Sequence, residues 1–242
     1  KPWRGRITPI NATDANNFFT SSNGYNAFIN HYANLNVGGV LLKNTIDAFM
    51  IGSELVGLTT YMSSPGVFPA VTQLKSLAAS VKSAVGAGVK VMYGGDWSEY
   101  HSSNGWYHLD PLWSDSNIDV VAIDCYFPLT PDLPQTQIDY QAIYDGWTQD
   151  EGWDYYYADS VNRTGLTSYG GSPTYAWKNV KHWWNSTHTN PNATVTAWTP
   201  KMKPVWFSEL GFPSVDGCAN QPNVFVDPDS VESFYPRGSR AR

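Results

Sequence analysis

Charged residues and cysteines are scarce in this sequence of 242 residues. Lys, Arg, Asp and Glu together make up 15% of the chain, the formal net charge is -6, and no basic stripe occurs. Because nucleic-acid binding depends on clustered Lys and Arg, we expect no nucleic-acid partner. The two cysteines, Cys125 and Cys218, provide no disulfide framework and can form at most one bridge.

Long apolar runs and the common metal, nucleotide and serine-hydrolase motifs are also missing from the sequence. No run approaches the roughly 20 apolar residues that span a bilayer, so we expect no membrane insertion. The histidines lack paired metal-ligand spacing, Ser53 lacks a Gly-x-Ser-x-Gly setting, and no phosphate-binding glycine loop occurs. We therefore expect neither a metal nor a cofactor. The chain begins abruptly at Lys1, as though it were cut from a longer protein.

Aromatic residues, by contrast, are abundant. They make up 15% of the chain and include 11 Trp and 15 Tyr. Aromatic faces pack well against the C–H-rich faces of sugars, although many of these side chains are expected to fill the core instead. The length fits one domain over residues 1–242, since a (β/α)₈ barrel takes roughly 250 residues.

Two short strands each end in a glutamate. Residues 203–213 read as a buried strand through Val205, Trp206 and Phe207, which places Glu209 at its carboxyl end. Residues 46–55 repeat this construction and place Glu54 after Gly52 and Ser53. In a parallel α/β barrel the carboxyl ends of the strands surround one pocket. A pair of carboxyl groups there is what glycoside hydrolysis needs, one as proton donor and one as nucleophile.

The remaining pattern predicts alternating helices and strands. A ragged apolar stripe predicts a helix over residues 14–37, and a clean stripe from Val71 to Val85 predicts a second helix that ends at Gly86. Strands are expected at residues 89–93 and 118–127. Strand, helix and strand at this spacing form a βαβ unit, which implies a parallel sheet.

Polar and aromatic residues near these strand ends are candidate substrate contacts. The loop over residues 94–100 carries two acids and two aromatics, the strand at 118–127 ends in an acid and a tyrosine, and the segment over residues 1–10 carries a tryptophan beside arginines. The candidates for contact with substrate are Trp3, Arg4, Ser53, Asp96, Trp97, Glu99, Asp124, Tyr126 and Trp206.

Residues 128–201 show no convincing strand but are rich in Trp and Tyr. Because so long a structureless loop is unusual inside a domain, we expect a subdomain over the pocket mouth or a helix-containing insertion. Residues 177–184 are its candidate helix. We expect part of this insertion to line a sugar cleft.

Several motifs in this order resemble one family. The segments WRGRI (3–7), FMIGSEL (49–55), YGGDWSEY (93–100), HLDPLW (108–113), 118–127, PVWFSELGFP (204–213) and NQPNVF (220–225) carry the likeness. Together they resemble the glycoside-hydrolase TIM-barrel-like domain of gene transfer agent and phage tail proteins. The resemblance implies a (β/α)₈ barrel similar to clan-A glycoside hydrolases, with strands 4 to 7 ending at Glu54, Tyr93, near Asp124 and at Glu209. It also implies Glu54 as acid/base, Glu209 as nucleophile and Tyr126 beside the nucleophile.

Two departures from the clan-A pattern bear on activity. Ser53 stands where those enzymes usually place an asparagine that holds the sugar 2-hydroxyl, so its shorter hydroxyl would reach the sugar through a water and catalysis would be less efficient. Too few residues precede Glu54 for three complete strands, and no eighth strand is evident after Glu209, so the barrel is expected to be incomplete and to leave exposed strand edges.

The resulting hypothesis is retaining hydrolysis of a cell-surface or peptidoglycan-type polysaccharide by a tail protein of a virion, which acts at the bacterial surface beside other tail-hub domains. Retention requires the carboxyl groups to lie about 5–5.5 Å apart, whereas about 6.5–9.5 Å indicates inversion. Two alternatives remain open, because a fold does not guarantee a function: a glycan-binding module without turnover, and a structural domain of a tail hub.

Overall fold

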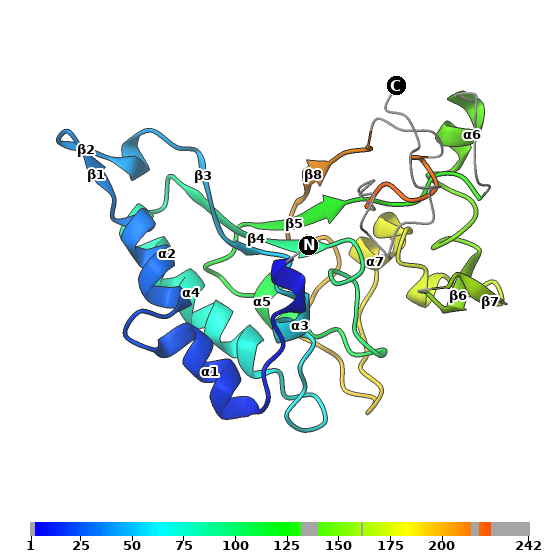
Figure 1. The fold of residues 1–242 in the computed structure, drawn as a ribbon, viewed down its shortest axis with the longest axis horizontal. Coiled ribbons are helices and arrows are strands. Elements are labelled where there is room, and N and C mark those ends of the chain that lie inside the picture. Colours follow the sequence, from blue (N-terminus) through cyan, green and yellow to red (C-terminus); the bar gives the residue numbers. More distant parts are fainter. Residues whose placement is uncertain (1–2, 132–139, 161, 214–217, 224–242) are drawn as a thin grey trace. The chain divides into compact units, whose positions relative to one another are not determined.

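The computed structural model describes residues 3–131, 140–160, 162–213 and 218–223 (Figure 1). These residues fall into two compact units. We call the first the sheet unit; it comprises residues 3–124 and 186–208. The second, the hairpin unit, comprises the described residues of 125–185 and 209–223. The expectation of a single domain over residues 1–242 stays a prediction.

A four-stranded sheet in the order β3-β4-β5-β8 forms the framework of the sheet unit. Its strands are β3 Ala48–Ser53, β4 Lys90–Asp96, β5 Val120–Cys125 and β8 Val205–Leu210, the last residues of β5 and β8 belonging to the hairpin unit. β3 pairs with β4, and β4 with β5, in parallel. The predicted α/β class, the parallel sheet and all four strands are thereby confirmed. β4 continues through Gly94 and Gly95 to Asp96, where a loop was expected, because its pairing with β5 extends to Asp124.

Helix α4 (Pro69–Val85) connects β3 to β4 and buries the predicted apolar stripe. It contacts both strands as well as helices α1 (Ala12–Thr20) and α2 (Tyr25–Ala33), which lie beside it in Figure 1. The helix ends where predicted, at Gly86, whose φ of 85° suits a residue without a side chain. This crossover makes β3, α4 and β4 the predicted βαβ unit.

The single helix expected over residues 14–37 is wrong, because the chain there forms α1 and α2 with a break between them. The amide of Gly24 donates to the carbonyl of Ser21 at 2.7 Å, which closes a turn. A side chain at position 24 would lie 2.9 Å from three backbone carbonyl oxygens, so only glycine fits. After α2 the chain makes the two-residue strands β1 (Asn36–Val37) and β2 (Val40–Leu41), which pair in an antiparallel hairpin.

The expectation that β8 is a buried strand is also wrong. Trp206 is 40% exposed and Phe207 is 45% exposed. β8 has a described neighbour only on its β5 side, so side chains on both of its faces keep contact with solvent. Such an apolar edge strand is the kind that normally pairs with another strand or is covered.

Short helical turns complete the sheet unit. They are η1 Arg4–Arg6, η2 Leu42–Asn44, α3 Val56–Thr59 and α5 Asp110–Trp113. In the described residues of the chain, no helix has the length and apolar character needed to cross a membrane.

The segment after residue 185 returns to the sheet unit through a buried histidine. The ring of His188 stacks on Tyr107 and on Trp198, with centroids 4.2 Å and 5.6 Å away, and its Nδ1 lies 2.9 Å from Oδ2 of Asp110. These contacts attach residues 186–198 to α5. The expected insertion over residues 128–201 is therefore divided between the two units.

The hairpin unit contains strands that the sequence did not reveal. β6 (Tyr155–Asp159) and β7 (Thr164–Ser168) pair in an antiparallel hairpin, with three consecutive β-favouring tyrosines in β6. Its helical elements are α6 Tyr140–Asp145, η3 Pro173–Tyr175 and α7 Val180–Asn185, of which α7 overlaps the predicted helix. Cys125 and Cys218 are both free thiols.

Lysine 178 holds several loops of the hairpin unit together. The Nζ atom of Lys178 donates to the carbonyls of Pro128, Gly146 and Gln149 at 3.0, 2.6 and 2.6 Å. Burial lowers the pKa of this amine to about 8. The three hydrogen bonds thus order a stretch that has few regular elements of its own.

Candidate active site

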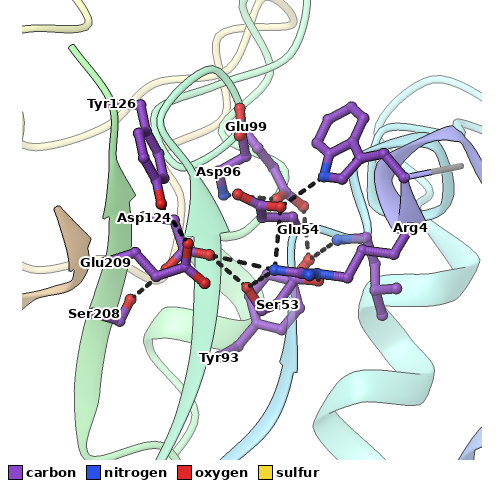
Figure 2. Close-up of polar contacts among 12 residues, drawn as sticks. Arg4, Ser53, Glu54, Tyr93, Asp96, Glu99, Asp124, Tyr126, Ser208 and Glu209 are labelled. Atoms are coloured by element: carbon purple, nitrogen blue, oxygen red, sulfur yellow. Dashed lines mark hydrogen bonds and ion pairs between the residues drawn. The ribbon is translucent and has the colours of Figure 1, made fainter. Parts of the chain in front are cut away.

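The carboxyl ends of the strands of the sheet unit carry a group of interacting polar side chains (Figure 2). The sheet register places Ser53 of β3 opposite Gly94 of β4, and Asp96 of β4 opposite Asp124 of β5. Parallel strands end at one edge of a sheet, which is where barrel enzymes hold their reacting groups. The structure therefore brings Ser53, Asp96 and Asp124 together, while their contact with a substrate stays a prediction.

Glu54 leaves β3 through an unusual backbone conformation. Its φ is 51°, in the left-handed region that a residue with a side chain seldom adopts. Its amide donates to the carbonyl of Gly94 at 2.8 Å, so the turn is tied to the neighbouring strand. Strained residues of this kind gather at functional sites when the surrounding structure supports them. The turn leaves Glu54 only 7% exposed.

The Glu54 carboxylate has two partners from the N-terminal turn. Nε1 of Trp3 donates to Oε2 of Glu54 at 2.6 Å, and Nη2 of Arg4 lies 3.1 Å from the same oxygen. Burial, and then the nearby carboxylates of Asp96 and Asp124, raise the pKa of Glu54, while Trp3 and Arg4 act in the opposite direction. The net shift is upward, which favours retention of a proton.

Asp96 is the carboxyl group that faces Glu54 from β4. It is buried, and its Oδ1 accepts hydrogen bonds from the amide and the hydroxyl of Ser98 at 2.8 and 2.5 Å. Burial is the main cause that raises the pKa of Asp96; a hydrogen bond with Glu54 opposes the shift. Two carboxyl groups so close share a proton more readily than they both ionise.

Asp124 lies buried at the end of β5 and is surrounded by donors. The hydroxyl of Ser53 donates to its Oδ2, and the hydroxyl of Ser208 donates to its Oδ1 at 2.7 Å. The Nε atom of Arg4 donates to the carbonyl of Ser53 at 2.7 Å, and its Nη2 atom donates to the hydroxyl of Ser53 at 2.9 Å. The same Nη2 atom lies 4.0 Å from Oδ2 of Asp124. The Ser53 hydroxyl, expected to face a sugar, is therefore bonded to protein groups on both sides.

Glycine 94 makes this contact between neighbouring strands possible. A Cβ at position 94 would lie 3.1 Å from the Ser53 hydroxyl and 3.3 Å from both carboxylate oxygens of Asp124. Ser53 and Asp124 meet above the glycine because no side chain stands between them. Ser208 was not among the sequence candidates, but a signal for it exists: Ser-Glu-Leu occurs at both 53–55 and 208–210.

Glu99 lies beneath the site rather than at its surface. It is fully buried, and its carboxylate accepts hydrogen bonds from the hydroxyls of Thr59 and Tyr93 and from the amide of Asp96. Burial raises the pKa of Glu99 to about 8. Its contact with substrate stays a prediction, although its burial favours a role through its neighbours.

The tryptophans proposed to contact substrate lie in three places of the sheet unit. Trp3 is 39% exposed next to Glu54, Trp97 is half-buried in the loop after β4, and Trp206 lies on β8. Of these, the structure ties only Trp3 directly to the carboxyl group of Glu54. Substrate contact by the other two stays a prediction.

Glu209 and Tyr126 belong to the hairpin unit, where they form a pair of their own. Oη of Tyr126 donates to Oε2 of Glu209 at 2.8 Å (Figure 2). Along the chain, Glu209 directly follows Ser208, and Tyr126 comes two residues after Asp124. A tyrosine beside the expected nucleophile is what the family resemblance implies.

The parallel sheet, its helical crossover and the acidic residues at its strand ends make this an α/β protein, with features that TIM-barrel-like domains share. The family model of the GTA TIM-barrel-like domain matches residues 23–242. The chain therefore belongs to this family, the domain of gene transfer agents that its motifs resemble. Comparisons with curated proteins and with solved structures gave no match.

Proposed function

We propose that this domain is a retaining glycoside hydrolase. Glu209 attacks the anomeric carbon while Glu54 gives its proton to the departing glycosidic oxygen. In the second step Glu54 takes a proton from water, the water oxygen bonds to the anomeric carbon, and the bond to Glu209 breaks. No cofactor takes part: after the first step Glu209 is bonded to the sugar and Glu54 is ionised, and after the second step Glu209 is a free carboxylate and Glu54 is protonated again.

The observation that carries the proposal is the environment of Glu54. A general acid must hold a proton near neutral pH, and burial beside other carboxyl groups is a known means of raising the pKa of a glutamate for this task. Glu54 has such a setting, with a raised pKa and a hydrogen bond to Asp96. Its left-handed backbone at a strand end is supporting evidence that its placement matters.

For Glu209, support comes from its partner and from the chain. A nucleophilic carboxylate must stay ionised and keep its orientation, and the Tyr126 hydroxyl donates to one of its oxygens. Glu209 also follows the serine that bonds Asp124, just as Glu54 follows the serine on the other side of Asp124. Each glutamate therefore comes directly after a serine that donates to Asp124.

The proposed substrate is a polysaccharide of the bacterial cell surface or a peptidoglycan-type glycan. The family supports this choice, since a gene transfer agent is a phage-like particle that must reach the cell through its envelope. We place the domain in the virion, beside other tail-hub domains or proteins. The exposed part of Trp3, next to the Glu54 carboxyl, offers an aromatic face to a sugar ring.

A second candidate, glycan binding without turnover, is favoured by the bonding of Ser53. Its hydroxyl is held by Arg4 and Asp124, at the position where clan-A enzymes usually offer an asparagine amide to the sugar. Arg4 also pairs with Glu54, the proposed acid. A purely structural domain of the tail hub is the third candidate.

The test uses the full chain with purified peptidoglycan sacculi and a panel of bacterial surface polysaccharides. Release of reducing ends is measured for the unaltered protein and for Glu54→Gln, Glu209→Gln and the control Asp47→Asn, which removes an exposed carboxylate before the opposite end of β3. We expect loss of hydrolysis in both glutamine variants only, and a product of retained anomeric configuration by proton NMR.

Other outcomes separate the candidates. Unchanged hydrolysis by Glu209→Gln rejects Glu209 as nucleophile, and an inverted product rejects the covalent step. Binding of a glycan without release of product selects the binding module. Absence of both binding and release across the panel selects the structural domain.

A further inference from the structure

We infer that Tyr93 and Glu99 are positioning residues that hold Glu54 and Asp96 in their paired arrangement. This inference rests on the proposed function, because the position of Glu54 matters most if its carboxyl group transfers a proton. Both side chains are almost completely buried in the sheet unit, and the bonds that the structure shows for them run to protein groups. Their influence has to pass through the groups they bond.

One connection runs to the residue after Glu54. The amide of Leu55 donates to Oη of Tyr93 at 2.8 Å, and that hydroxyl donates in turn to Oε1 of Glu99 at 3.0 Å. The hydroxyl of Thr59 bonds the same oxygen. A left-handed residue persists only where its neighbours restrain it. Tyr93 restrains the peptide that follows Glu54 and so supports that conformation.

The other connection runs to the carboxyl group that faces Glu54. The amide of Asp96 donates to Oε2 of Glu99 at 3.1 Å, while the side chain of Asp96 shares a hydrogen bond with Glu54. One buried carboxyl group thus fixes the backbone on both sides of the pair, through Leu55 on the β3 side and through Asp96 on the β4 side. A site of this kind needs such support, because small displacements of a reacting group cost much of its rate.

Protonation states agree with this arrangement. The pKa of Tyr93 lies well above its ordinary value because the ring is buried near Glu99, so the hydroxyl keeps its proton and remains a donor. With a pKa of about 8, Glu99 is mostly neutral at pH 7. The Thr59 hydroxyl donates to Oε1 of Glu99 and also lies 3.3 Å from the carbonyl of Val56. Each polar group of the connection then has a partner.

The test compares Tyr93→Phe with Tyr25→Phe. Tyr25 also uses its hydroxyl on β3, donating to the carbonyl of Ile51 at 3.1 Å, but not next to Glu54. Glutamate labelled with ¹³C at the carboxyl carbon is incorporated, and Glu54→Gln assigns the Glu54 signal among the five glutamates. The Glu54 carboxyl is then titrated by NMR, and urea unfolding checks that each variant is folded.

We expect the raised pKa of Glu54 to fall by at least about 0.5 unit in Tyr93→Phe, toward that of an exposed glutamate, and to change by less than about 0.2 unit in Tyr25→Phe. With a hydrolysed glycan as substrate, kcat of Tyr93→Phe should fall about tenfold with little change in KM. If Tyr93→Phe does not fold, Thr59→Val replaces it and should lower the pKa in the same direction.

An unchanged Glu54 titration in the folded Tyr93→Phe or Thr59→Val variant overturns the inference, whether or not hydrolysis is found. An equal shift in the Tyr25→Phe control also overturns it, since the effect would then be general loosening of β3. A specific shift in a protein that hydrolyses no glycan supports the positioning role and removes the proposed hydrolase instead.

Discussion

Replacement of Arg4 by methionine should raise the pKa of Glu54 further. The Nη2 atom of Arg4 lies 3.1 Å from Oε2 of Glu54, and this cation opposes the effects of burial and of the nearby carboxylates. Methionine keeps much of the aliphatic length of the side chain and removes the charge. The ionised form of Glu54 then loses its only described cationic contact at this distance, while Asp96 and Asp124 continue to disfavour it.

The magnitude follows from Coulomb's law with a correction for solvent. At 3.1 Å and an effective dielectric constant of about 20, the attraction is about 5 kcal/mol. The side chain of Arg4 is 44% exposed, so water and salt screen much of this energy and leave about 1–2 kcal/mol. Since 1.36 kcal/mol corresponds to one pKa unit, we expect a rise of about one unit.

Carboxyl ¹³C NMR titration of Glu54 measures this shift directly. Arg6→Met is the matched control, because it removes an exposed charge from the same η1 turn. In a hydrolysing protein, the basic limit of the pH–rate profile should move upward with the pKa of Glu54. A Glu54 pKa that stays constant or falls in Arg4→Met, or that rises equally in Arg6→Met, would refute the assignment of Arg4 as the cation that keeps this acid in range.

Three further predictions concern stability. Glu99 has a pKa of about 8 in the folded protein and of 4.5 in the unfolded chain. Its contribution to the free energy of unfolding is therefore complete below pH 4.5, and on the order of 4 kcal/mol of it is lost as pH rises through 8. Glu99→Gln should flatten this part of the plot of unfolding free energy against pH, measured by urea unfolding. Burial lowers the pKa of His108 from 6.5 to about 4, so its neutral form stabilises the fold above pH 6.5. Up to about 3 kcal/mol of unfolding free energy is lost as pH falls toward 4, and His108→Phe should remove this loss. Gly94→Ala should cost about 1–2 kcal/mol, because its methyl group crowds Ser53 and Asp124.

Each of these predictions has a result that contradicts it. For the two ionisable groups, it is a difference between variant and unaltered protein that does not depend on pH. For Gly94→Ala the control is Gly88→Ala, where a Cβ meets no atom within 4 Å. Equal unfolding free energies for the two alanine variants would show that the contact above Gly94 tolerates the extra methyl group.

The strands and the acidic residues at their ends were predictable because the local sequence pattern of these segments agrees with their place in the folded sheet. Apolar runs bounded by glycine and proline identified β3, β4, β5 and β8, and the rule that parallel strands end together placed Ser53, Asp96 and Asp124 at one edge. The stripe from Val71 to Val85 likewise lies within α4, which begins two residues earlier, at Pro69. In these elements a single periodicity runs without interruption.

The errors lie where a long-range contact decides the outcome. The break between α1 and α2 depends on the close approach of three carbonyl oxygens to Gly24, and β6 and β7 depend on each other rather than on an apolar alternation. Burial of Glu99 follows from bonds to Thr59 and Tyr93, which lie 40 and 6 residues away in the sequence. The local sequence pattern identified Glu99 as an acidic residue of a loop, but it did not identify the residues that Glu99 bonds.

The backbone of Glu54 also bears on the stability of the protein. Asparagine or glycine would adopt a φ of 51° with less strain and would not bring a carboxyl group into a poorly hydrated place. A protein selected only for resistance to unfolding would therefore gain from losing this glutamate, by roughly 1–3 kcal/mol from relief of strain. An inactive variant that outlasts its parent on heating is the usual mark of a residue kept for activity at the expense of stability.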